Sequence, residues 1–120
     1  MQLITDKGQI EFINLTPHDI NLIRDNRTVL SLPRAINPPR VEERVDSQQH
    51  LSVNGSYDIP IYQARNEYVA KLPEKREGYY YIVSRIIAEY SERDDLLVPH
   101  GLVRDSNGNI IGCSSFKKVN

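Results

Sequence analysis

Cysteine and excess charge of either sign are both scarce in this 120-residue sequence. Cys113 is the only cysteine, which excludes an internal disulfide bond and a zinc site made of four cysteines. The 15 lysines and arginines nearly balance the 16 aspartates and glutamates, for a formal net charge of -1. Because no basic excess is available to attract a phosphate backbone, we expect no nucleic-acid partner.

Long apolar runs are also missing. None approaches the roughly 20 residues that a membrane-spanning helix needs. The first 12 residues carry Asp6, Lys7 and Glu11 where a signal peptide would need an apolar core. A single cysteine fits a reducing compartment. We therefore expect a soluble cytoplasmic protein without a membrane partner, folded as one domain over residues 1–120.

The sequence does contain many short apolar segments separated by turn residues, the pattern of a mostly β protein. Prolines at 33, 38 and 39 predict an extended connector. Asn54-Gly55 predicts a tight hairpin turn, since both positions of such a turn need positive φ. The two-residue period of the flanking strands then predicts one buried face. Its members are Leu51, Val53, Tyr57, Ile59 and Ile61.

The other predicted elements are two more hairpins, one inner strand and one helix. Strands are predicted at residues 10–13, 20–24, 28–32, 79–83, 96–98, 102–105 and 110–116. Ser84 is a good N-cap, and helical spacing predicts about two turns of helix over residues 85–92. The predicted fold class is α+β, mostly antiparallel β-sheet with one short C-terminal helix and a C-terminal hairpin.

Residues for metal binding or covalent catalysis are few. His18, His50 and His100 are far apart in sequence, and none shares a helical turn with another, so we predict no metal site. Cys113 lies in an apolar segment, where a thiol is usually buried and protonated. The sequence has no nucleophile elbow, dinucleotide fingerprint or P-loop. We therefore predict no catalytic residues, no cofactor and no enzymatic activity.

Arginine and tyrosine are the better functional candidates. A guanidinium holds phosphate through two hydrogen bonds, and a tyrosine ring can stack on a base. Alternation along residues 79–83 places Tyr80 opposite Tyr79 and Tyr81, so at least one ring is expected to be exposed. The alternative is that these residues make only surface ion pairs and half-exposed contacts. The arginines on or beside predicted elements are Arg34, Arg40, Arg44, Arg85, Arg93 and Arg104.

Asp94 and Asp95 form an adjacent acidic pair between the predicted helix and the next strand. Side chains of neighbouring extended residues point to opposite faces, so at most one of the two can enter a common site. The alternative is that they only end the helical region and solvate a loop.

Several stretches resemble a group of small phage and prophage proteins. They are Asn14-Leu15-Thr16-Pro17-His18, Leu72-Pro73-Glu74, Gly78, Tyr81-Ile82-Val83-Ser84, Arg93-Asp94-Asp95, Val103-Arg104-Asp105, Gly108 and Ile110-Ile111-Gly112-Cys113. This pattern is similar to that of the first-described Thoeris anti-defence proteins of phages. The resemblance covers the start of the chain and most of its last 50 residues, while the centre matches less well.

The resemblance implies a signal sponge in the cytoplasm of a bacterial host. Such proteins sequester, without degrading it, a cyclic ADP-ribose isomer made by the Thoeris TIR enzyme. They also hold cyclic oligonucleotides at a separate site and assemble as dimers joined into hexamers. The resemblance therefore implies a cyclic nucleotide as the small-molecule partner and a homo-oligomer, either dimer or hexamer.

The ligand-binding residues predicted on this basis are Asp95, Arg104, Arg93, Arg85 and Tyr80. Only Asp95 is carried over from the family pattern, as an acceptor for ribose hydroxyls. Asn109 stands where the family pattern expects a basic residue, and Glu92 where it expects an amide, so Arg104 is the predicted substitute phosphate donor. We expect Arg93, Asp95 and Arg104 at the rim of one cleft between the helix and the C-terminal hairpin, closed by a second copy.

Two other functions remain open at this point. The first is a structural or protein-interaction accessory phage protein, with the region around residues 40–53 as its surface. The second is a small nucleotide-processing enzyme that uses Asp94, Asp95 or His100.

Overall fold

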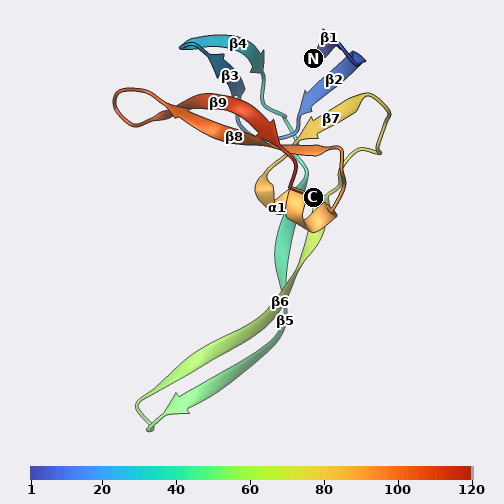
Figure 1. Cartoon of the computed structure of the whole chain (residues 1–120). Coiled ribbons are helices and arrows are strands. Elements are labelled where there is room, and N and C mark those ends of the chain that lie inside the picture. Colours follow the sequence, from blue (N-terminus) through green and yellow to red (C-terminus); the bar gives the residue numbers. More distant parts are fainter. Residues whose placement is uncertain (120) are drawn as a thin grey trace.

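The computed structural model describes residues 1–119, which form nine strands and one helix (Figure 1). A sheet-containing body holds seven strands, and the two longest strands form an arm that projects from it. The elements are β1 (Gln2–Thr5), β2 (Gly8–Asn14), β3 (Ile20–Arg24), β4 (Arg27–Leu32), β5 (Arg40–Val53), β6 (Tyr57–Ala70), β7 (Tyr79–Ile82), α1 (Arg85–Ser91), β8 (Leu96–Arg104) and β9 (Ile110–Lys117).

The seven body strands lie in the order β1-β2-β7-β8-β9-β3-β4. The pairs β2–β7, β7–β8 and β3–β9 are parallel, and the other pairs are antiparallel. The fold is therefore mostly β with one short helix, as predicted, but the sheet is mixed. Parallel neighbours need a crossover connection, and α1 supplies one between β7 and β8. Apolar periodicity reports which face a residue occupies and carries no information on strand direction.

Two apolar clusters cover opposite faces of the inner strands. Tyr81 and Ile82 are adjacent in β7, so their side chains enter different clusters. On one side Ile87 and Ala88 of α1 pack with Tyr81, which explains why this short helix is held in place. The cluster on the other face consists of Ile20, Leu32, Ile82, Leu97 and Cys113.

The local turn and helix predictions are largely confirmed. The hairpin between β3 and β4 turns through Asp25 and Asn26, with φ of 49° and 62°. Helix α1 begins at Arg85 after Ser84, whose backbone is extended, although the Ser84 side chain makes no capping hydrogen bond. Strand β8 is continuous where two shorter strands were predicted, and β1 was not predicted at all.

The arm is where the burial prediction was wrong. The Asn54-Gly55 turn is present, and the strand register puts Leu51 opposite Ile59 and Val53 opposite Tyr57 on one face. That face is exposed: the exposed fractions are 51% for Leu51, 61% for Tyr57, 43% for Ile59 and 40% for Ile61. Each arm strand has 14 residues, so the hairpin extends beyond any element that could cover it.

The helical content is confined to α1 within residues 1–119, and no helix in that range is long and apolar enough to cross a membrane.

Candidate functional site

The Asn-Leu-Thr-Pro-His stretch forms a hydrogen-bonded turn at the end of β2. The Asn14 amide nitrogen donates to the carbonyl oxygens of His18, Leu32 and Pro33 at 2.8, 3.1 and 3.1 Å. The Asn14 side-chain oxygen Oδ1 accepts hydrogen bonds from the backbone amide and the hydroxyl of Thr16. Asn14 and Thr16 are both buried. This motif therefore ties β2 to the end of the β3–β4 hairpin, which is a structural task.

Arg93 and Asp95 form a partly buried ion pair just before β8, with Asp95 the buried partner. Both Asp95 oxygens accept hydrogen bonds from Arg93, at 3.0 Å from Nε and 2.7 Å from Nη2. Arg93 Nη1 also donates to the Pro73 carbonyl at 2.7 Å, and the guanidinium lies over the Tyr81 ring. The hydrogen bonds to Asp95 raise the pKa of Arg93. Asp95 is only 4% exposed, and its two oxygens are already occupied.

Asp94 faces solvent, unlike the buried Asp95. Both residues nevertheless line the cavity described below, so the prediction that at most one of them can enter a common site was wrong. Its side chain is 68% exposed and forms a salt bridge with Lys75. The hydrogen bond from Lys75 lowers the pKa of Asp94 most, and Lys118 adds a smaller electrostatic contribution in the same direction. Asp94 is therefore a solvent-facing carboxylate paired with the Lys75 ammonium group.

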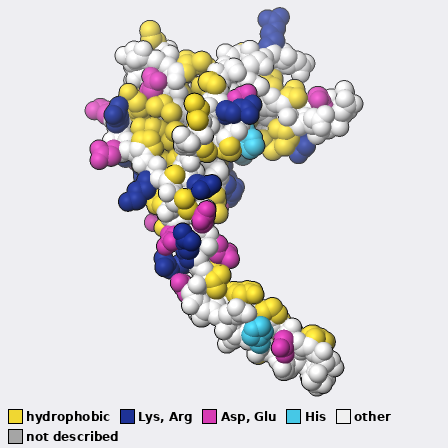
Figure 2. Space-filling model, turned by 180° about the vertical axis from the view of Figure 1, so that it is seen from behind, with side chains coloured by type: hydrophobic (Ala, Val, Ile, Leu, Met, Phe, Trp, Pro, Cys, Tyr) yellow, Lys and Arg dark blue, Asp and Glu magenta, His cyan; other side chains and the backbone are white. Residues whose placement is uncertain are grey.

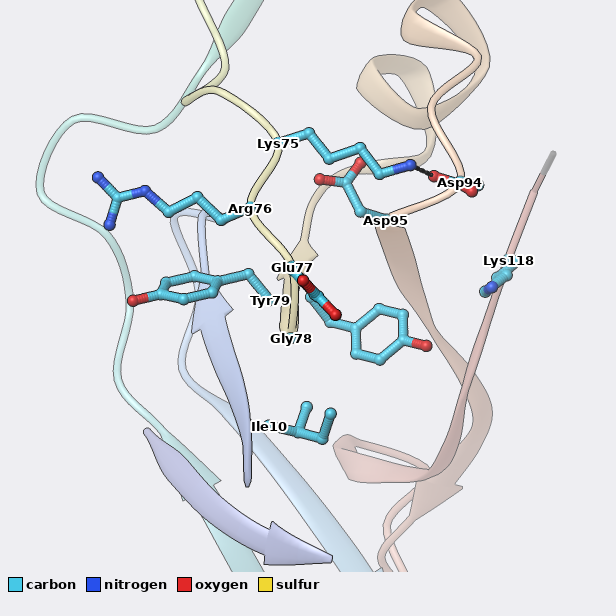
Figure 3. A pocket seen from close by; sticks show the side chains of 10 residues that line it. Ile10, Lys75, Arg76, Glu77, Gly78, Tyr79, Asp94, Asp95 and Lys118 are labelled. Atoms are coloured by element: carbon cyan, nitrogen blue, oxygen red, sulfur yellow. Dashed lines mark hydrogen bonds and ion pairs between the residues drawn. The ribbon is translucent and has the colours of Figure 1, made fainter. Parts of the chain in front are cut away.

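A cavity of about 210 Å³ lies where the loops before β7 and β8 meet the end of β9 (Figure 3). Figure 3 shows Lys75 reaching across to Asp94, while Arg76 extends in the opposite direction. Lys118 approaches from the chain segment after β9. The lining residues are Ile10, Lys75, Arg76, Glu77, Gly78, Tyr79, Tyr80, Asp94, Asp95 and Lys118.

Cations and aromatic rings are paired twice at this cavity. The Lys118 ammonium lies 5.7 Å from the centre of the Tyr80 ring, and the Arg76 guanidinium lies 5.4 Å from that of Tyr79. Within residues 1–119 neither cation forms a salt bridge, whereas Lys75 does. Such a cation can donate charge-assisted hydrogen bonds to an incoming anion without first leaving a carboxylate.

The structure brings some of the predicted site residues together and leaves others apart. Tyr80 and Asp95 both line the cavity. Arg93 does not line it but holds Asp95 by two hydrogen bonds. Arg104 lies at the opposite end of β8, where it donates to the Gly108 carbonyl at 2.8 Å. Arg85 lies on α1 and pairs with Glu89. One subunit therefore has no single cleft with Arg93, Asp95 and Arg104 at its rim, because Asp95 lies just before the nine-residue strand β8 and Arg104 is its last residue.

The prediction that at least one of the three consecutive tyrosines is exposed was wrong. Tyr81 is buried at 2% exposure, and Tyr79 and Tyr80 are half-buried. Tyr80 stacks on Phe12 at 5.7 Å between ring centres, which covers part of it.

Sequence reasoning missed Lys75, Arg76 and Lys118. Lys75 and Arg76 lie in the polar, turn-rich segment of residues 72–78, whose sequence is typical of a loop. Lys118 is near the end of the sequence. A basic pair two residues before an aromatic strand was the available signal. No pattern in the sequence indicates that residue 118 returns to this loop, since that depends on the order of the strands.

The structure also bears on the cysteine and on possible metal ligands. Burial raises the pKa of the Cys113 thiol, which keeps it protonated as predicted. Within the described part of the chain, no three histidine, cysteine, aspartate or glutamate side chains gather closely enough to hold a metal ion.

Comparison with known proteins yields no match: no family model fits the chain, no curated protein matches its sequence, and no solved structure matches its fold.

Proposed function

We propose that this chain is a phage-encoded, non-catalytic sponge for a cyclic ADP-ribose signal. It binds the nucleotide made by a TIR enzyme in the bacterial cytoplasm and keeps it from the defence system that the signal activates. The sequence resemblance to Thoeris anti-defence proteins supports this ligand class. Cyclic oligonucleotides are a second class of ligand under the same proposal.

The observation that carries the proposal is the grouping of Lys118, Tyr80 and Asp94 at one cavity. An ammonium group suits a phosphate, and an exposed carboxylate suits the hydroxyls of a ribose. Since Lys118 lies over the Tyr80 ring, a phosphate drawn to Lys118 brings the rest of the nucleotide beside an aromatic surface. The three features together match the parts of a nucleotide.

The size of the cavity bears on how the ligand is held. At about 210 Å³ it is smaller than the roughly 300–1,000 Å³ of a typical small-molecule pocket. One copy can therefore enclose a phosphate and its ribose but not a whole dinucleotide. In this proposal a second copy completes the site, and Arg104 of that copy is a candidate for the additional phosphate contact.

A thermal unfolding experiment tests the proposal. A cyclic ADP-ribose isomer at about 100 times its Kd should stabilise the folded protein by roughly 2.7 kcal/mol, which raises Tm by several degrees. The ligand recovered after heating should have an unchanged mass. Inorganic phosphate at the same concentration serves as the control for simple anion binding. No shift with any cyclic nucleotide would contradict the proposal.

The projecting arm favours a second function, that of a structural or protein-interaction accessory protein of a phage. Its exposed apolar side chains and unpaired strand edges suit contact with another protein. This function predicts an unchanged Tm in the presence of nucleotides.

A further inference from the structure

The distal half of the arm, residues 47–63, is an amphipathic ribbon. Cross-strand pairing puts Leu51 beside Ile59 and Val53 beside Tyr57, and Ile61 follows on the same face. The opposite face carries Asp58 and Tyr62 with other mainly polar side chains. Tyr57 and Leu51 are more than half exposed. A face of this composition is normally covered by another layer.

Charge is segregated along the arm. Between residues 47 and 63 the only aspartate, glutamate, lysine or arginine is Asp58. The proximal half instead holds seven such residues, several of which are linked by salt bridges such as Arg65–Asp46 at 3.0 Å. Figure 2 shows this change, with charged side chains gathered near the body and hydrophobic ones along one side of the distal arm. Depletion of charge is characteristic of the buried centre of an interface.

The arm is anchored at its base but unsupported at its end. Tyr68 packs edge-on against Tyr90 at 4.8 Å, and Val41 packs against the core. A register shift between Val45 and Ser47 marks the boundary between the charge-rich and charge-poor halves. A two-stranded ribbon without a covering layer is at best marginally stable in water. The distal half therefore needs a partner surface.

The body carries an apolar groove that no other element covers. Leu102, Ile110 and Ile111 of the β8–β9 hairpin are 55%, 54% and 44% exposed. They line a hollow of about 710 Å³ together with residues at the start of β3. The one carboxylate of this hollow, among the described residues, belongs to Asp19, which pairs with Arg34 at 3.1 Å.

These two apolar surfaces cannot meet within one chain, because the arm extends away from the body (Figure 1). We propose that they meet between copies: the distal arm of one copy lies in the β8–β9 groove of another, and the second copy returns the contact. The partner is thus a second copy of this chain, and the pair is closed by a two-fold axis. This inference does not rest on nucleotide binding.

The electrostatics of the two surfaces fit this pairing. Neither the apolar arm face nor the groove lining contains a lysine or arginine, and Asp58 lies on the other face of the ribbon. Docking therefore buries no unpaired charge and brings no like charges together.

The area to be covered favours reciprocal docking over stacking of two arms. Seven residue pairs of a two-stranded ribbon have a footprint of roughly 23 by 10 Å. If two arms stacked on each other, each copy would bury one such footprint, and Leu102, Ile110 and Ile111 would stay exposed. Reciprocal docking uses two surfaces per copy and comes closer to the ~800 Å² that each partner buries in a stable complex.

The mass of the assembly in solution, measured by light scattering after gel filtration, tests the contact. Wild-type protein should contain two copies of the 13.8 kDa chain, or an even multiple. Ile59→Glu puts a charge on the apolar face and should at least halve that mass. Tyr62→Glu makes a similar change on the opposite face and should leave it unaltered. A single-copy wild type overturns the proposal, including the case in which the arm binds a different protein.

A mixing experiment identifies the groove as the receiving surface. Ile59→Glu keeps an intact groove, and Leu102→Glu keeps an intact arm. A tagged Ile59→Glu chain should therefore retain Leu102→Glu chains but no further Ile59→Glu chains. If Leu102→Glu alone assembles like the wild type, the arm does not occupy this groove. Both variants should fold, because all the substituted positions are exposed. Circular dichroism checks this.

Discussion

The Arg93 guanidinium holds both carboxylate oxygens of Asp95 and also reaches the carbonyl of Pro73. This one side chain links the start of β8 to the loop that precedes β7. Its neighbour Asp94 is thereby turned outward to Lys75, at the candidate nucleotide cavity. The partly buried pair thus has a positioning task, and the exposed pair next to it is accessible to a ligand.

Arg93→Ala should destabilise the fold strongly. It leaves the Asp95 carboxylate buried without its partner, which typically costs about 3–5 kcal/mol. Urea unfolding followed by circular dichroism measures the loss. Arg85→Ala is the matched control, because its pair with Glu89 is exposed and such pairs contribute about 0.3–0.5 kcal/mol. Similar losses for the two variants would contradict the assigned role of Arg93.

Asn14→Ala should also lower stability. It removes the donor to the Leu32 and Pro33 carbonyls in a buried turn, and an unsatisfied buried group costs about 1–3 kcal/mol. Asn66→Ala, at an exposed position of β6, is the control. The same unfolding measurement applies, and equal stability of both variants would show that the turn network is dispensable.

Stability should depend on pH through Asp94. Its pKa in the folded state lies below the ordinary value of 3.8 because Lys75 donates to it. The unfolded chain therefore takes up the proton at a higher pH, and the contribution of the pair is present above pH 3.8 and lost as the pH falls through the lower folded value. The Tm values of wild type and Asp94→Asn should differ at pH 6 and converge in acid. A difference that persists at pH 2 would contradict this explanation.

Lys118→Ala should weaken nucleotide binding. A hydrogen bond to a charged group contributes about 1.5–3 kcal/mol, so we expect at least a roughly tenfold rise in Kd by calorimetry. Lys7→Ala, in the exposed β1–β2 turn, is the control for loss of one positive charge. Equal affinities for the two variants would remove Lys118 from the site.

Arg104→Ala tests whether a second copy completes that site. Within its own chain Arg104 lies at the far end of β8 from Asp95. If the partner's hairpin contributes to the cavity, this variant should weaken binding by about 1 kcal/mol or more, which is at least a roughly fivefold rise in Kd, while the fold stays intact. An unchanged Kd would confine the site to one copy.

Local features of the fold could be predicted from the sequence. Asn54-Gly55 and Asp25-Asn26 form turns because these residues tolerate positive φ, and Ser84 precedes α1 as expected. The exposure of the arm could not be predicted, because the alternation of residues 51–61 shows that one face is apolar and does not show what covers it.

The candidate site was only partly predictable for a related reason. Asp95 and Tyr80, two of the predicted ligand-binding residues, line the cavity, but the sequence does not show that both Asp95 oxygens accept hydrogen bonds from Arg93. Lys118 reaches the cavity because β9 pairs with β8, a long-range arrangement that short-range patterns do not contain.

The most direct test of the central claim is equilibrium dialysis of the purified protein against a cyclic ADP-ribose isomer, followed by mass spectrometry of the released ligand. The account predicts saturable binding and full recovery of the nucleotide at its original mass. Absence of binding, or recovery of a hydrolysed product, would contradict it.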